Sequence, residues 1–231
     1  MGNRELSRRL QLLPSTVARL THTLCLHGYL RRDPSSSRYR LGPAALTLAH
    51  PMVSGLTLRR LARPAMTAMA QQVGGAVSLG LRHQTDMVYV ETAWRTDERL
   101  LPPDIGAPMP MLASAMGRAW LARAPHDEQN AVLNRLRLSD ADNVMRYANA
   151  LKRASAEIEH TGCCWSRDAR PSIQAVAVPF ARPIGGISFV MNCGVFAPQP
   201  LAAARARTIG RALVELVRCL ERTVWYRAAP N

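Results

Sequence analysis

The chain has 231 residues, of which 48% are hydrophobic, 20% charged and 5% aromatic. This is a globular composition, too apolar for a disordered chain, and no stretch approaches the roughly 18 consecutive apolar residues of a membrane span. The N-terminus, MGNRELSRRLQLL, lacks the apolar stretch of a secretory signal, so we expect a cytoplasmic protein without a membrane partner.

Positive charge is the strongest compositional signal. Thirty Lys and Arg residues against 16 acidic ones give a net charge of +14, and residues 1–50 hold eight arginines but only two acids, Glu5 and Asp33. A GC-rich genome alone would favour arginine, so part of this bias carries no function. Its concentration at one end of the chain is typical of nucleic-acid binding, although an anionic membrane surface would also attract it.

The first forty-two residues predict two helices followed by a basic hairpin. In chain order these are helices at 4–10 and 14–27 and strands at 29–32 and 38–41. Pro14 suits the first turn of a helix, and Gly28 suits a position just beyond a helix end. The Pro/Ser-rich turn at 33–37 favours a hairpin. This order is that of a winged helix-turn-helix, which we assign to residues 1–42 as a DNA-binding domain.

The remaining sequence predicts a linker and then a mixed helix and sheet domain. Residues 43–55 hold a linker helix at 44–49 and the domain boundary. Residues 56–231 show helical periodicity at 56–73, 113–123, 126–136, 142–160 and 199–224 and strand-like runs at 76–82, 87–94, 173–180 and 185–193. The predicted fold class is therefore α+β, with helices at the margins of a sheet.

No catalytic, cofactor or metal motif stands out. The sequence has no G-x-S-x-G elbow, no P-loop and no H-E-x-x-H pair. The five scattered cysteines do not form a disulfide framework. His160, Cys163 and Cys164 make a metal site or a thiol nucleophile conceivable, but a second ligand pair is missing and chance proximity is the better interpretation. We therefore expect no metal, no cofactor and no enzyme activity.

Three segments carry a family resemblance. ELSRRLQLLPSTVARLTHTLCLHGYLRRDPSSSRYRLGPAALTLA at 5–49 resembles the DNA-binding half of IclR-type transcriptional regulators, and IGAPMPMLASAMGRAWLA at 105–122 and SIQAVAVPF at 172–180 resemble segments of their second domain. The resemblance implies that residues 56–231 form a GAF-like effector-binding domain, an antiparallel sheet with flanking helices. It also implies a homodimer or dimer of dimers, double-stranded operator DNA as partner, and a small carbon-source metabolite or aromatic acid as effector.

The sequence departs from the family pattern at its start. Members of the family have an additional helix before the first helix predicted here, so the expected winged helix-turn-helix is truncated. Either the start codon is assigned too late, or the DNA-binding domain is impaired. The second possibility supplies an alternative function, a ligand-binding or interaction protein derived from such a regulator.

The candidate DNA-binding residues are Ser15, Thr16, Arg19, Arg38 and Arg40. The first three lie at the front of the second helix, which enters the major groove in such motifs, where Arg19 can pair with a guanine. The two hairpin arginines suit phosphates or the minor groove. Taken singly, Ser15 and Thr16 are better interpreted as helix-start residues and Arg19 as solvated charge, and Arg38 and Arg40 have surface charge as their alternative. Within the winged motif, DNA contact is the favoured interpretation.

The candidate effector-binding residues are carried over from the family by position: Ala115, Met116, Ser166, Asp168, Ala175, Met191 and Cys193. Ser166 and Asp168 are alternatives for a polar anchor, and the small and apolar residues fit a hydrophobic core equally well. Strand alternation groups Phe189 with Met191 and Cys193 on one face. Arg118, Arg167 and Arg170 lie near the proposed pocket loops in the sequence. We therefore expect an anionic organic acid with an apolar or aromatic body.

Overall fold

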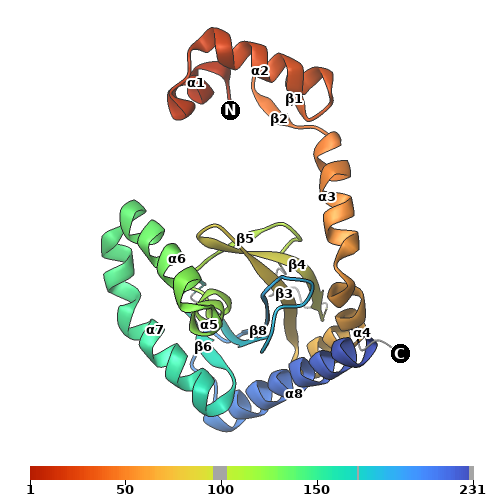
Figure 1. The fold of residues 1–231 in the computed structure, drawn as a ribbon, viewed down its shortest axis with the longest axis vertical. Helices are drawn as coiled ribbons and strands as arrows, with labels where there is room; N and C mark the ends of the chain where they lie inside the picture. The colour runs from red at the N-terminus through yellow and green to blue at the C-terminus, as the bar shows by residue number, and fades with distance from the viewer. Residues whose placement is uncertain (96–102, 171, 229–231) are drawn as a thin grey trace. The chain divides into compact units, whose positions relative to one another are not determined.

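The computed structural model describes residues 1–95, 103–170 and 172–228. The chain forms two compact units, Met1–Thr57 and Leu58–Asn231, here called the first and the second unit (Figure 1).

The first unit has the elements of a winged helix-turn-helix. They are α1 (Asn3–Leu10), α2 (Pro14–Leu26), β1 (Leu30–Arg32), β2 (Tyr39–Leu41) and α3 (Ala44–Gly55). The two strands pair in antiparallel register, with Arg31 opposite Arg40. The predicted helices and hairpin are confirmed, and Pro14 stands at the first position of α2 as expected.

Two contacts attach the hairpin to α2. At its base, Gly28 adopts a positive φ of 71°, and a Cβ on Gly42 would lie 2.1 Å from the carbonyl oxygen of Gly28, so only glycine fits this crossing. On the hairpin itself, the hydroxyl of Tyr39 lies 3.0 Å from the hydroxyl of the buried Thr21 in α2. Tyr39 therefore packs between the wing and the helix, as its apolar ring predicts.

Helix α3 is longer than the sequence pattern predicts. We expected it to end at residue 49, before His50–Pro51, but it continues through Pro51 to Gly55. A proline inside a helix removes one backbone hydrogen bond and does not have to end the helix when the following residues keep helical geometry. The helix leaves Leu46, Leu48 and Met52 exposed.

The second unit is a six-stranded antiparallel sheet with helices on both faces. Its elements are α4 (Thr57–Val73), β3 (Gly75–His83), β4 (Asp86–Trp94), β5 (Pro108–Pro110), α5 (Ala115–Arg123), α6 (His126–Ser139), α7 (Ala141–Thr161), β6 (Cys164–Ser166), β7 (Ile173–Pro179), β8 (Phe189–Phe196) and α8 (Ala203–Ala228). The strand order is β5-β4-β3-β8-β7-β6. Helix α5 packs against the sheet with α6 and α7 outside it, whereas α4 and α8 lie on the other side (Figure 1).

Three strands of the second unit differ from the sequence prediction. The edge strands β5 and β6 have three residues each and were not predicted, because so short a run shows no alternation. Strand β8 begins at Phe189 instead of residue 185. Gly185 and Gly186 have positive φ angles and form a turn closed by the pairing of Ile184 with Ile187.

A bulge in β4 controls which way its side chains point. Leu79 pairs with Glu91, but the next residue, Gly80, pairs with Tyr89, so Val90 is an extra residue in β4. In a regular strand, residues 89 and 91 would point to the same face. The bulge places Tyr89 on the α5 face, in the core with that helix, and Glu91 on the α4 face.

Candidate functional site

The front of α2 presents the first group of predicted residues. Ser15 and Arg19 are exposed and Thr16 is half-buried, and their spacings of three and four residues place them on one side of the helix. The same helix turns Val17 and Thr21 inward as its buried residues. The arrangement leaves a hydroxyl and a guanidinium facing solvent together, the groups that contact phosphates and base edges.

The hairpin adds a second basic surface. Arg31, Arg32 and Arg40 line a shallow hollow together with Asp33 and Pro34. Arg40 pairs with Asp33 at 3.4 Å, whereas Arg38 is exposed. Sequence reasoning singled out Arg38 and Arg40 and missed Arg31 and Arg32, although the run of arginines before the turn was a usable signal.

Asp33 fixes the turn of the hairpin and gives a pH prediction. Its carboxylate accepts hydrogen bonds from the side chain and backbone of Ser35, and these lower its pKa from 3.8 to about 2. Because the folded-state pKa is the lower one, the turn gains stability above pH 3.8 and loses it as the pH falls through 2. We expect a carboxyl NMR titration to give a midpoint near 2, and a midpoint near the ordinary value of 3.8 would contradict these hydrogen bonds.

A cavity in the second unit lies between α5, the sheet and the segment after β6. The empty space within it, including open solvent at its mouth, is about 590 Å³. Its lining residues come from all six strands of the sheet, the segments before β5 and after β6, and the N-terminus of α5: Ala76, Ser78, Tyr89, Pro103, Met109, Ser114, Ala115, Ser166, Arg167, Ala169, Arg170, Ile173, Ala175, Asn192 and Gly194.

Three of the predicted effector-binding residues line this cavity. Ala115 begins α5, Ser166 ends β6 and Ala175 lies on β7. The Ser166 hydroxyl donates a hydrogen bond of 2.8 Å to the carbonyl oxygen of Ala113, which ties the wall after β6 to the approach to α5. The polar residues of the sheet wall, Ser78, Tyr89 and Asn192, were missed.

Met191 and Cys193 do not line the cavity. The expected alternation holds: Asn192 and Gly194 face the cavity, and Met191 and Cys193, which were carried over from the family by position, point to the other side of β8. Both faces of this strand are buried, so hydrophobicity does not distinguish them.

Met116 and Asp168 also lie outside the lining. The Met116 side chain packs on Gly80, where a Cβ would lie 2.4 Å from its sulfur atom. The Asp168 carboxylate pairs with the buried Arg118, whose Nε donates to the carbonyl oxygen of Leu112 at 2.7 Å. A buried guanidinium requires a partner, so Asp168 and Arg118 are used in holding the walls together.

The N-terminus of α5 is the electropositive end of the cavity. The Ser114 hydroxyl accepts a hydrogen bond of 3.0 Å from the backbone N–H of Gly117 and caps the helix. First-turn amides such as those of Ala115 and Met116 have no acceptor within their own helix, and the helix dipole favours negative charge beside them. Arg167 and Arg170 also line the cavity, and the described lining residues include no carboxylate.

Tyr89 provides a neutral polar group in the sheet wall. Burial raises its pKa to about 12, while the charge of Arg170 and a hydrogen bond from Asn192 act in the opposite direction. Its phenol therefore stays protonated at neutral pH and is able to donate or accept a hydrogen bond inside the cavity.

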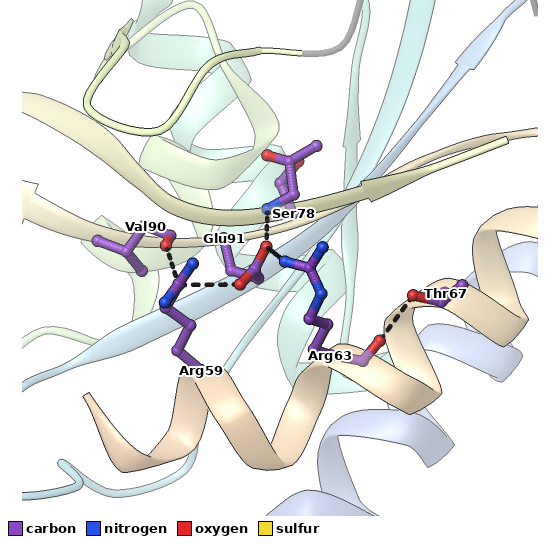
Figure 2. Close-up of polar contacts among 7 residues, drawn as sticks. Arg59, Arg63, Thr67, Ser78, Val90 and Glu91 are labelled. Carbon is purple, nitrogen blue, oxygen red and sulfur yellow. Dashed lines mark hydrogen bonds and ion pairs between the residues drawn. The ribbon is translucent and has the colours of Figure 1, made fainter. Parts of the chain in front are cut away.

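On the opposite face of the sheet, Glu91 anchors α4. Figure 2 shows Arg59 and Arg63 reaching from α4 to its carboxylate, with N–O distances of 2.8 Å for each pair. Arg59 Nε also donates to the carbonyl oxygen of the bulge residue Val90 at 3.0 Å. The Glu91 side chain is 2% exposed. The bulge in β4 thus connects Tyr89, which lines the cavity, to α4, the helix that follows the linker.

Three of the five cysteines are buried thiols. Burial raises the pKa values of Cys163, Cys164 and Cys193, so these thiols remain protonated. Residues 1–95, 103–170 and 172–228 contain no group of three or more His, Cys, Asp and Glu placed to hold a metal ion. Within the same ranges, no helix has the length and apolarity needed to cross a membrane.

The two units together have the architecture of a ligand-responsive DNA-binding protein, and comparison with known proteins identifies its family. Residues 50–199 match the family model for the bacterial transcriptional regulator IclR C-terminal domain, and residues 1–34 match the IclR helix-turn-helix domain. The chain therefore belongs to the IclR family of transcriptional regulators. The expected α+β fold and the resemblance are both confirmed.

Individual relatives agree with this membership. The chain is 30% identical over 225 residues to the HTH-type transcriptional regulator TsaQ1/TsaQ2 of Comamonas testosteroni, covering 96% of this chain and 81% of that protein. An IclR family regulator from Brucella abortus superposes with a TM-score of 0.88 and 33% identity, covering 97% of this chain and 85% of the other. Both relatives are transcriptional regulators and not enzymes.

A more distant structure shares the fold. It is an IclR homologue from Microbacterium hydrocarbonoxydans in complex with 4-hydroxybenzoate, with a TM-score of 0.69 and 22% identity over 96% of this chain and 92% of that one.

A helix-turn-helix match at residues 1–34 favours a DNA-binding regulator over the alternative of a derived ligand-binding protein.

Proposed function

We propose that residues 1–42 bind operator DNA through α2 and the hairpin, that residues 43–55 form the linker, and that residues 56–231 bind an effector in the α5 cavity. Ser15, Thr16 and Arg19 enter the major groove, and Arg38 and Arg40 contact the backbone or minor groove. The chain acts in the cytoplasm as a homodimer or a dimer of dimers, for which the exposed Leu46 and Leu48 of α3 offer an apolar surface.

The effector is a small organic acid with an apolar or aromatic body. The observation that carries this proposal is the cavity itself, which combines the N-terminus of α5 and two arginines with apolar walls. A carboxylate beside the amides of Ala115 and Met116 would occupy a favourable anion position, and Arg167 or Arg170 would complement its charge. The 4-hydroxybenzoate bound by the Microbacterium homologue is an acid of this class.

Thermal unfolding with added acids tests the effector class. Benzoate and 4-hydroxybenzoate are added to the full chain, and unfolding is followed by tryptophan fluorescence, since all four tryptophans lie beyond residue 57 and report on the second unit. An acid at 100 times its dissociation constant stabilises the folded state by about 2.7 kcal/mol. The proposal predicts that the acids raise the unfolding temperature and that neutral analogues such as benzamide leave it unchanged.

Two arginine variants separate base reading from backbone contact. Arg19→Ala should weaken binding to the operator by about 1–3 kcal/mol while changing non-specific binding little, because a base contact discriminates between sequences. Arg38→Ala should weaken both kinds of binding similarly and reduce the slope of log affinity against log salt by about 1, because a phosphate contact is sequence-blind.

Fluorescence anisotropy measures both effects, with the intergenic DNA beside the chain's own gene and a scrambled duplex of equal length. A ratio of specific to non-specific affinity that Arg19→Ala leaves unchanged would rule out this side chain as a base reader.

A further inference from the structure

Asn192 is the unusual polar residue of the cavity wall. It lies on β8 among the lining residues, and it pairs across the sheet with Ser78 and Ala177. The residue is only 8% exposed, and within the described chain its Oδ1 atom is buried with no hydrogen-bond partner. Buried amide oxygens in native proteins are nearly always paired, so an unpaired one in a cavity wall indicates a group still to be bound.

Asn192 lies close enough to Tyr89 to lower the pKa of its phenol, against the larger effect of burial. Among the described residues, the Oδ1 atom of Asn192 has no such polar neighbour bonded to it. The neighbouring Ser78 hydroxyl accepts from Thr92 at 3.0 Å instead of serving Asn192.

From this arrangement we propose that Asn192 is a specificity-determining residue that selects effectors carrying a hydrogen-bond donor, a hydroxyl or amino group, in addition to their acid group. The inference rests on the proposed function, because it assumes that the effector occupies this cavity. An effector lacking the donor leaves Oδ1 buried and unpaired, whereas one with a well-placed O–H or N–H satisfies it. A site built this way discriminates more strongly than one that only matches shape.

Matched ligand pairs test the selection. Calorimetry with the full chain compares 2-, 3- and 4-hydroxybenzoate with the fluorobenzoates substituted at the same positions, since fluorine is small but donates no hydrogen bond. We expect at least one hydroxybenzoate to bind about tenfold more tightly than its fluoro counterpart. For Asn192→Leu, which removes the acceptor at similar size, this ratio should fall to near one.

Two further variants keep the test decisive. Gln174→Leu is the matched control, because this amide on β7 lies outside the lining and already bonds to Ala197, Gln199 and Leu201; it should retain the preference for the hydroxyl. Tyr89→Phe removes the polar neighbour of Asn192 in the cavity wall and should weaken the preference without abolishing acid binding, which provides a readout if Asn192→Leu folds poorly.

The possible failures are distinguishable. If benzoates bind but the hydroxyl gives no advantage at any position, or if Asn192→Leu keeps the full ratio, the role of Asn192 is wrong and the proposed function stands. If no acid in the series binds, the proposed effector class is wrong, and the inference falls with it.

Discussion

Replacing Glu91 with alanine is expected to lower the free energy of unfolding of the second unit by about 3–5 kcal/mol, the usual cost of removing one partner from a buried ion pair. The Glu91 side chain is 2% exposed and forms ion pairs with two guanidinium groups, Arg59 and Arg63. Without it, the half-buried Arg59 would keep its charge against the bulge in β4 with only the carbonyl oxygen of Val90 as a partner.

Urea unfolding followed by tryptophan fluorescence measures this loss in the second unit. The control is Glu215→Ala, which removes an exposed pair with Arg222 on α8 and should change the same free energy by less than about 1 kcal/mol. If both variants lost similar small amounts of stability, the ion pairs of Glu91 with Arg59 and Arg63 would contribute no more than a surface ion pair. In that case the apolar residues of α4 alone would hold it to the sheet.

The second large effect is expected from Ala115→Trp, which should abolish effector binding. Ala115 is 1% exposed, begins α5 and lines the cavity next to the capped helix end. An indole at this position would occupy the space beside the first-turn amides, where we place the carboxylate of the effector. DNA binding by the ligand-free chain should remain near wild-type strength, because the substituted residue belongs to the other unit.

Calorimetry with a benzoate that binds the wild-type chain measures this effect. Because a large residue at a buried position can prevent folding, Ala76→Leu on the sheet wall serves as a second, smaller obstruction of the same cavity. Circular dichroism establishes whether each variant is folded. A folded Ala115→Trp or Ala76→Leu chain that binds the acid at wild-type strength would place the effector elsewhere.

Sequence periodicity predicted every helix of the described chain and the central strands of the sheet. Amphipathic spacing, Pro14 and the glycines at helix ends were sufficient, because these signals act within a few residues. The same local reasoning placed the exposed residues of α2 and the hairpin on the right elements. It ended α3 too early because Pro51 was read as a stop, whereas a proline within a helix can also be tolerated.

The cavity was predicted less well because its geometry depends on contacts distant in the sequence. Every residue of β8 from Phe189 to Val195 is buried, so alternation groups the residues but does not show which group faces α5. Met191 and Cys193, which were carried over from the family by position, fall on the face of β8 away from the cavity. The bulge at Val90, which separates Tyr89 from Glu91, is a property of strand pairing and left no mark in the sequence pattern.

The role of Asp168 illustrates the same limit. As a carboxylate in the loop after β6 it was a reasonable polar anchor, but Arg118 lies fifty residues away and becomes its partner only in the folded chain. Ser166 and Ala115, which were carried over from the family by position, do line the cavity. The polar sheet residues Ser78 and Asn192 gave no signal, since each lies inside an apolar strand.

We further propose that effector binding in the second unit changes DNA binding by the first, as expected of a regulator that senses its effector. The most direct test measures the dissociation constant for the operator duplex by fluorescence anisotropy, with and without a saturating benzoate that calorimetry shows to bind. Allosteric coupling of the usual strength predicts a change of about 5- to 150-fold for the wild-type chain and no change for Ala115→Trp. A wild-type chain that binds the acid and yet binds its operator equally well with and without it would contradict the claim.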